Sequence, residues 1–381
     1  MKKSLYRLLV SMLVVAIVGS FSLIACKQEV AEEEKVAEEE VAEEEVAEEE
    51  VAEEPLVIGY LCPTMAIQWC QNIDAAYREF AKMNNFEVMT MDAAMKTEVV
   101  MDQTETLISQ QVDGIIVCVG QTDIGAAVHA RCKEEGIPSI SESLRATDED
   151  GNLVAPVVEL DAYNVGSRAS EWIVDNYESL GMEIADDYSD VGFFYIYSGI
   201  LPIEQLRAAG VLDKFLEGMP DFPENNIYEL DTAGTTTGAQ EEAYNKMTGT
   251  IVSRPDIKYW FGVGCLDTYG QGAARALEAA GMTDTAIVAS LGGEQALVEW
   301  AAGHTKPWYA ATYFTAWDCA ELITEGLMLM IREGVPIEEL WPEYIAEGQK
   351  YASRTFTGNV MTPDNYNEQL NDFDRKIIFG E

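Results

Sequence analysis

The sequence predicts an α/β protein built from two doubly wound parallel sheets. From residue 56 onward, short and almost entirely apolar segments alternate with stretches of helical spacing, a pattern typical of parallel strands buried on both faces. The pattern runs twice, with a break near residue 160. The roughly 326 residues after position 55 are enough for two domains of ordinary size.

In the first half the apolar segments LVIGYLC and VDGIIVCV are the clearest strands, and Gly136 marks the end of a helix. Strands are expected at 56–62, 86–91, 112–119 and 137–141, with helices at 69–84, 97–111 and 123–135. In the second half VGFFYIY and KYWFGVG are the clearest strands. Strands are expected there at 191–197, 226–230, 258–264 and 286–291, with helices at 163–180, 203–218, 237–253, 267–280 and 294–303.

The last part of the chain departs from this alternation. A strand-like segment at 309–315 and a helix at 316–333 precede a polar region with strand character at 343–361 and a short helix at 364–370. A return of the chain to the first domain, and then to the second, explains this order. In folds of this kind ligands bind beyond the carboxyl ends of the strands.

Residues 1–25 have the three parts of an export signal. Positive charges come first, an apolar segment at 8–18 follows, and Leu23-Ile24-Ala25-Cys26 closes the segment. This closing sequence resembles the bacterial lipobox, in which the cysteine is lipidated and becomes the mature N-terminus. We therefore expect Cys26 to carry a lipid anchor; the alternatives are an ordinary signal peptide and an uncleaved anchor.

An acidic tether is expected at 26–55. The pentad Val-Ala-Glu-Glu-Glu recurs there, and residues 27–54 hold 15 Glu and two Lys. A five-residue repeat advances a helix by about 500°, so no apolar stripe forms and the segment cannot bury a face. Its reach is roughly 40 Å if helical and about 90 Å if extended, which allows a domain to turn freely near a membrane.

The folded part is strongly acidic. Subtracting the +3 of the signal and the −13 of the tether from the net charge of −43 leaves −33 on residues 56–381. Such a charge disfavours nucleic acid and anionic lipid as partners. The seven cysteines show no metal-like spacing and mostly lie in apolar segments. The sequence also allows one or two disulfide bonds between them.

Several segments resemble the type I periplasmic binding proteins of ABC transporters, most closely the arabinose-binding members. They are VDGIIVCVGQTD, LRAAGVLDKFLE, RPDIKYWFGVGCLDTYGQGAARALEAAG, IVASLGGEQALV and VMTPDNYNEQL. The resemblance covers residues 56 to about 375. It implies two α/β lobes joined by a hinge of three crossings, near 160, 313 and 343. The N-terminal lobe would be 56–160 plus 314–342, and the C-terminal lobe 161–313 plus 343–381.

The resemblance also implies ligand-binding residues. Arg207, in the R-x-x-G pattern after strand 191–197, would grip ligand oxygens with its fork of donors. Trp69 would stack on the apolar face of a sugar ring. Tyr313 and Thr315 match cleft positions, whereas Trp308, Tyr309 and Trp317 suit hinge or core packing.

Two carboxylates, and three positions that differ from the family pattern, complete the candidate site. Glu142 ends strand 137–141, where sugar binders place a carboxylate, and a solvated loop is the alternative. Asp267 starts a helix, and a helix N-cap is favoured there over direct contact. Where sugar-binding relatives carry Asn or Asp, this chain has Gly120, Leu266 and Gly292.

Two further positions that differ from the family pattern come after the first strand. Pro63 and Ile67 stand where the arabinose binders have a lysine and a glutamate. Because each buried hydroxyl without a partner costs about 1–3 kcal/mol, these changes disfavour plain arabinose. They favour a deoxy or substituted sugar, a nucleoside-like ring or another small amphiphile, and a sugar remains the first expectation.

The expected function is that of a monomeric solute receptor, not an enzyme. No G-x-S-x-G, P-loop or Rossmann glycine pattern occurs, so no catalytic or cofactor site is expected. The receptor would face the periplasm or cell exterior and hand a small solute, first of all a sugar, to a membrane permease. A sensory receptor that presents its ligand to a signalling partner is the alternative.

Overall fold

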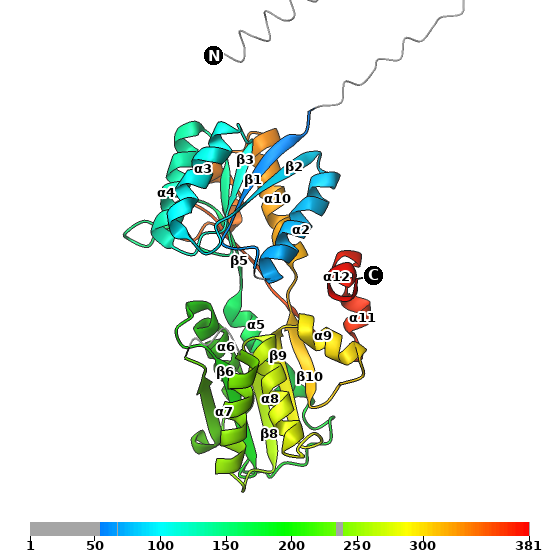
Figure 1. Ribbon diagram of the computed structural model, residues 1–381. Coiled ribbons are helices and arrows are strands. Elements are labelled where there is room, and N and C mark those ends of the chain that lie inside the picture. Colours follow the sequence, from blue (N-terminus) through cyan, green and yellow to red (C-terminus); the bar gives the residue numbers. More distant parts are fainter. Residues whose placement is uncertain (1–53, 67, 234–238, 381) are drawn as a thin grey trace, which may run out of the picture. The chain divides into compact units, whose positions relative to one another are not determined.

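The structure is a computed structural model that describes residues 54–66, 68–233 and 239–380. The export signal, Cys26 and all but the last two residues of the tether lie outside this range, as does Ile67. The fold class is confirmed: Figure 1 shows two α/β lobes, each with a central sheet and helices on both faces.

The first sheet has six strands in the order β11-β5-β4-β3-β1-β2, and all its pairings are parallel. The strands are β1 (Leu56–Cys62), β2 (Phe86–Asp92), β3 (Gly114–Val117), β4 (Ser139–Glu142), β5 (Val157–Leu160) and β11 (Ser353–Phe356). Helices α2 (Gln68–Met83) and α10 (Ala316–Arg332) pack on one face, and α3 (Val100–Ser109) and α4 (Thr122–Glu135) on the other. The side chains of β1 therefore alternate between two separate cores.

The second sheet has the order β12-β10-β9-β8-β6-β7, with β12 antiparallel to β10 and the other pairings parallel. Its strands are β6 (Val191–Tyr197), β7 (Ile227–Asp231), β8 (Tyr259–Gly264), β9 (Ala286–Gly292), β10 (Trp308–Tyr313) and β12 (Asn359–Met361). Helices α5 (Ala162–Asn176) and α6 (Pro202–Gly218) cover one face. Helices α7 (Ala239–Ser253), α8 (Asp267–Ala279) and α9 (Glu294–Ala301) cover the other.

The predicted helices and strands differ from these bounds by a few residues. Gly136 ends α4 as expected, with a left-handed φ of +71°. Two elements were not predicted: β5, whose four residues end in a Glu-Leu pair, and α12 (Asp372–Phe379). The helix expected at 364–370 is the single turn α11 (Tyr366–Gln369).

The last crossing between the sheets lies later than the predicted position near 343. Residues Ser353 to Phe356 pair with Val157 to Leu160, so β11 extends the first sheet. Leu340 and Trp341 also pack in the first core. The assignment of 343–356 to the C-terminal lobe was therefore wrong, because the edge of β5 offers this short polar strand a parallel partner. The chain reaches the second sheet between β11 and β12.

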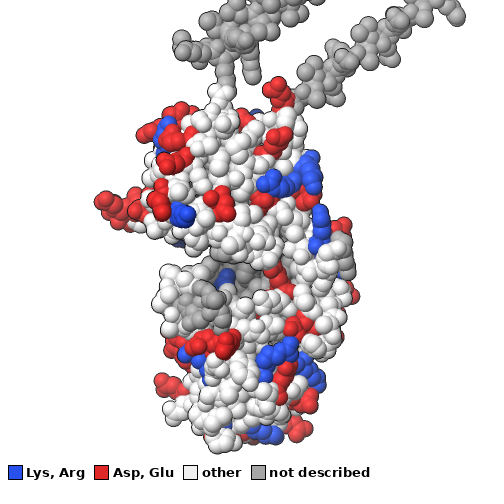
Figure 2. Space-filling model, viewed as in Figure 1, with Lys and Arg blue, Asp and Glu red and all other residues white. Residues whose placement is uncertain are grey.

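The six described cysteines are all buried and free. Their thiols therefore act as small apolar core groups in this structure. Within the described ranges no helix has the length and apolar character needed to cross a bilayer, and no group of three or more His, Cys, Asp and Glu is arranged for a metal ion. Acidic side chains are spread over the face shown in Figure 2, with basic ones interspersed.

Candidate ligand cavity

A cavity of about 490 Å³ lies where the carboxyl ends of strands from both sheets meet. This volume suits a small ligand. Its lining residues lie at or after the carboxyl ends of β1, β4, β5, β6, β8, β9, β10 and β11. They are Gln68, Trp69, Ser143, Leu160, Ile203, Arg207, Leu266, Asp267, Thr268, Leu291, Gly292, Glu294, Gln295, Phe314 and Phe356. Five of the predicted site residues are thus brought together: Trp69, Arg207, Leu266, Asp267 and Gly292.

Three aromatic rings form one wall of the cavity. The ring centroids of Trp69 and Phe356 lie 6.3 Å apart with an interplanar angle of 6°, and Phe314 lies 5.9 Å from Trp69. Flat apolar rings of this kind bind the C–H face of a sugar or another ring. Trp69 was predicted from the sequence as a site residue, but neither phenylalanine was; Phe314 directly follows β10, and Phe356 is the last residue of β11.

Glu142 lies beneath this wall and is fully buried. Its carboxylate accepts hydrogen bonds from the Tyr60 hydroxyl at 2.9 Å, the Ser143 hydroxyl at 2.8 Å and the Trp69 indole N–H at 3.4 Å. Burial raises the pKa of Glu142, and these three donors oppose that rise. Glu142 does not line the cavity, and it is not the solvated loop residue considered above. Two of its hydrogen-bond donors, Trp69 and Ser143, do line the cavity.

Replacing Glu142 with Ala should lower the free energy of unfolding by about 2–4 kcal/mol, because the Tyr60 hydroxyl and the Trp69 N–H lose their acceptor. The Trp69 indole should also become more mobile. Urea unfolding followed by tryptophan fluorescence measures both effects. Glu142→Gln keeps a carbonyl acceptor and should lose less than half as much stability; an Ala variant as stable as the wild type would contradict the assigned role.

Arg207 is the basic residue among the described residues that line the cavity. Its side chain is 6% exposed, and its Nη1 donates to the Cys265 carbonyl at 3.0 Å. Its Nε has no hydrogen-bond partner, and the guanidinium carbon lies 5.3 Å from the centre of the Phe314 ring. Burial lowers the pKa of this guanidinium. A buried donor without an acceptor raises the free energy of the folded protein. A ligand oxygen that accepts a hydrogen bond from Arg207 would reduce this cost.

Close helix packing fixes the position of Arg207. A Cβ atom added at Gly166 on α5 would lie 2.1 Å from the Arg207 carbonyl oxygen, and one at Gly210 would lie 2.0 Å from the Tyr163 carbonyl oxygen. Only glycine allows helices α5 and α6 to approach this closely. The backbone that carries Arg207 is therefore held by packing and not by a loop.

Asp267 lines the cavity, but the predicted N-cap role was wrong in its detail. Leu266 is the N-cap of α8, and Asp267 is the first residue inside that helix. Its carboxylate accepts from the Ser290 hydroxyl at 2.6 Å and from the backbone N–H of Gln295 at 2.9 Å. Asp267 thus caps the following helix α9, and burial raises its pKa.

The backbone conformation explains why position 292 is a glycine. Gly292 has a φ of +122° and Gly293 a φ of +94°, and Gly293 also packs against Tyr313. Residues with a Cβ atom rarely adopt these angles. A residue with a Cβ atom at position 292, Asn and Asp included, would therefore be strained in this backbone conformation.

The other predicted site residues do not line this cavity. Tyr313 is 6% exposed and packs in the second core. Thr315 caps α10 and donates to Asp374 at 2.6 Å, so its hydroxyl already has a partner. Gly120 and Pro63 line a separate cavity of about 290 Å³ in the first lobe.

Glu294, which was not predicted from the sequence, is the third charged residue that lines the cavity, after Arg207 and Asp267. Its carboxylate accepts from the Asn72 amide at 2.7 Å, and Asn72 in turn accepts from Gln68 at 2.8 Å. Asn72 belongs to the first lobe and Glu294 to the second. An adjoining cavity of about 500 Å³ shares Gln68, Thr268, Glu294 and Gln295, so Glu294 faces both spaces.

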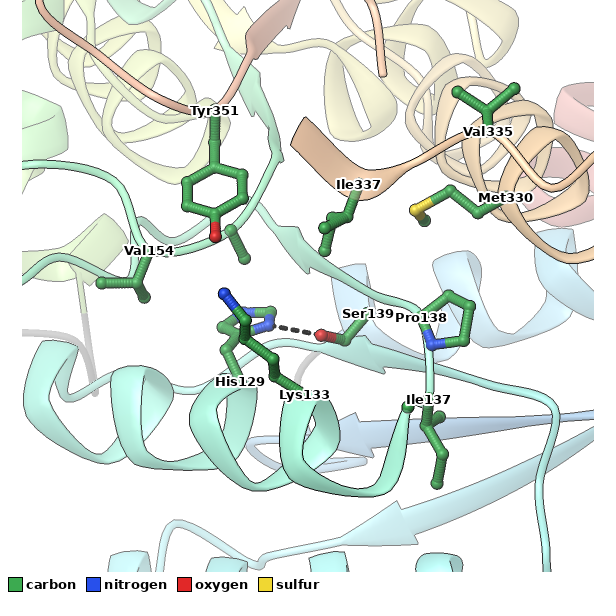
Figure 3. A pocket seen from close by; sticks show the side chains of 12 residues that line it. His129, Lys133, Ile137, Pro138, Ser139, Val154, Met330, Val335, Ile337 and Tyr351 are labelled. Atoms are coloured by element: carbon green, nitrogen blue, oxygen red, sulfur yellow. Dashed lines mark hydrogen bonds between the residues drawn. The ribbon is translucent and has the colours of Figure 1, made fainter. Parts of the chain in front are cut away.

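A further cavity of about 210 Å³ lies in the first lobe beside His129 (Figure 3). Both ring nitrogens of His129 are hydrogen bonded at 2.8 Å, to Ser139 and Ser141. Burial lowers the pKa of His129 to about 3, so the ring is neutral and structural. The basic residue that lines this cavity, Lys133, is exposed and pairs with Glu338, unlike the buried Arg207, so this cavity is not the candidate site.

Comparison with known proteins identifies the class. A family model described as a periplasmic binding protein domain matches residues 58–332. The ABC transporter L-arabinose-binding periplasmic protein of Azospirillum brasilense is 23% identical over 284 residues, covering 74% of this chain and 82% of that protein. The xylitol-binding protein of Mycolicibacterium smegmatis is 31% identical over 223 residues, 57% of each chain.

Solved structures show the same fold. A periplasmic solute-binding protein of an ABC transporter from Actinobacillus succinogenes 130z, with bound D-allose, gives a TM-score of 0.62 at 19% identity and covers 82% of this chain and 99% of that one. The 5-methylthioribose transporter solute-binding protein from Thermotoga lettingae gives 0.60 at 15% identity, covering 86% and 93%. The chain belongs to the periplasmic binding protein family, a family of binding proteins and not of enzymes, which confirms the resemblance seen in the sequence.

Proposed function

We propose that this protein is the solute receptor of an ABC importer and that its solute is a small ring compound, first of all a monosaccharide or sugar derivative. The observation that carries the proposal is the cavity with an aromatic wall and a buried Arg207 whose Nε lacks a partner. The names of the relatives, which bind L-arabinose and xylitol, support a sugar-like solute.

The cavity suggests how capture works. Arg207 donates to oxygens of the solute, while Trp69, Phe314 and Phe356 contact its apolar face. The lining residues come from strands of both sheets, so a bound solute contacts both lobes at once. Binding then favours the closed arrangement of the lobes, which the permease recognises. The many apolar lining residues favour a deoxy or substituted sugar, or a nucleoside-like ring, over a free polyol.

The N-terminal segment supports a location in the cell envelope. In this proposal Cys26 carries a lipid anchor, and the acidic tether holds a monomeric receptor within roughly 40–90 Å of the membrane that contains the permease. The sensory alternative uses the same anchor and the same closure. Loss of solute uptake after deletion of the gene supports transport, whereas unchanged uptake with a lost transcriptional response supports sensing.

A thermal-shift screen tests the binding function. Residues 54–381 contain both sheets and all five apolar cores and form one compact unit, so this fragment is suitable. Pentoses, hexoses, deoxy sugars, nucleosides and amino acids form the panel. A ligand at a thousand times its Kd adds about 4 kcal/mol of stability, which raises Tm clearly. A shift with a sugar or nucleoside is expected; a shift with amino acids alone would contradict the proposed solute class.

A further inference from the structure

The charges around the cavity are unbalanced. Of the described groups in or beside it, Arg207 is basic, whereas Glu204, Asp267, Glu294 and Asp374 are acidic. Glu204 and Asp267 act on Arg207 itself, and their carboxylates also accept hydrogen bonds from backbone N–H groups. Among the described residues, the charged groups that act on Glu294 itself are both acidic, Asp267 and Asp374, and no basic group acts on it directly.

Glu294 is the acidic group most available to a solute. Its charged neighbours are Asp267 on α8 and Asp374 on α12, and both are acids. One of its oxygens accepts from the neutral Asn72 amide. Burial, followed by the effect of Asp267, raises the pKa of Glu294 to about 7. In the free protein a proton thus neutralises this carboxylate for part of the time.

Arg207 gives the independent observation that this cavity is built for a ligand. It is 6% exposed, lines the same cavity as Glu294, and keeps an Nε donor without a partner. Arg207 and Glu294, both on the second lobe, therefore bring a donor group and an acceptor group to a cavity that Trp69, Phe314 and Phe356 also line. A matching solute has an acceptor for Arg207, an apolar ring face and a donor for Glu294.

We propose that the solute carries a protonated amine that binds Glu294, together with an oxygen that binds Arg207. This inference rests on the proposed receptor function and narrows its solute class. A hydroxyl group would satisfy one oxygen of Glu294 but would leave Glu294 and the neighbouring Asp374 without a compensating cation. An ammonium group compensates this charge and replaces the proton that Glu294 holds in the free protein.

Matched pairs of probes test the inference by titration calorimetry on residues 54–381. The pairs are D-glucosamine with D-glucose, D-galactosamine with D-galactose, and tyramine with tyrosol. In each pair that binds, the amine should bind roughly tenfold or more tightly at pH 7, where the amino sugars are mostly protonated, because a charge-assisted hydrogen bond replaces a neutral one. Titrations at pH 7 in two buffers with different ionisation enthalpies should show proton release on amine binding.

Two variants complete the test. Glu294→Gln keeps the acceptor for Asn72 and should abolish both the amine preference and the proton release. Glu241→Gln removes the same charge from an exposed position on α7 and should change neither. Equal affinity for amine and neutral probe, or a preference retained in Glu294→Gln, overturns the inference while leaving the receptor function intact. Absence of binding by every sugar and every aromatic probe counts against the receptor function itself.

Discussion

Replacement of Arg207 with Met should weaken solute binding at least tenfold and leave the fold intact. Arg207 lines the cavity, and its guanidinium donates from Nη1 to the Cys265 carbonyl; a further hydrogen bond from this charged donor to the solute contributes about 1.5–3 kcal/mol. Loss of that bond corresponds to a factor of about 10–150 in Kd. Titration calorimetry with the solute found in the screen measures the change.

The stability of this variant distinguishes a binding role from a structural one. The substitution removes a buried cation without an ion pair, which is favourable, and leaves the Cys265 carbonyl without its donor, which is not. These effects oppose each other, so Tm should change by only a few degrees. Arg131→Met, which removes an arginine paired with Glu105 and Glu135 on the surface, is the matched control and should bind normally.

Affinity and Tm of Arg207→Met together separate the binding role of Arg207 from a structural one. Unchanged affinity in Arg207→Met would remove Arg207 from the site. Weak binding together with a large fall in Tm would indicate that the guanidinium mainly supports the end of β8. Normal Tm with weak binding is the outcome that the unpartnered Nε predicts.

Strong local patterns explain which parts of the fold were predictable. VGFFYIY and KYWFGVG are continuous apolar segments, and a strand buried on both faces needs such a sequence. The segment SRTF of β11 has no such signal, since it is a polar edge strand. Its four residues carry no information about which sheet they join, because that choice depends on the free edge of β5.

The candidate site was partly predictable for a related reason. Trp69, Arg207 and Asp267 each follow a strand in a segment that resembles the family, so sequence placed them near the cavity. Phe314 and Phe356 reach it only because two crossing segments meet there, which depends on tertiary structure. The available signal was an aromatic residue at the carboxyl end of a strand, since Phe314 directly follows β10 and Phe356 ends β11.

Glu142 and Glu294 show how burial changes the interpretation of a carboxylate. The sequence suggested Glu142 as a direct ligand contact, yet three donors surround it beneath Trp69. Nothing in the sequence indicated Glu294 as a site residue. In the structure it faces two cavities, and the charged groups that act on it are both acids. Hydrogen-bond partners and neighbouring charges, which only the structure gives, separate the supporting carboxylate from the available one.

The stability of the ligand-free protein should fall as pH rises from 5 to 8, and Glu294 should account for part of this change. Burial raises its pKa from 4.5 to about 7 in the folded state. Because the folded pKa is above the unfolded one, the stabilisation is full below about pH 4.5 and is lost as pH rises through 7. A shift of this size corresponds to about 3 kcal/mol, and partial solvent screening reduces it to about 1–3 kcal/mol.

Glu294→Gln cannot titrate and should therefore gain stability relative to the wild type as the pH rises. The difference in free energy of unfolding between the two proteins should grow by about 1–3 kcal/mol from pH 5 to pH 8. Urea unfolding at four pH values measures it, with Glu241→Gln expected to follow the wild type. Parallel stability curves for Glu294→Gln and the wild type would show that Glu294 is ionised at an ordinary pH in the folded protein. In that case another group must stabilise the ionised Glu294 carboxylate. The Asn72 amide, which donates a hydrogen bond to it, would be the first group to test by substitution.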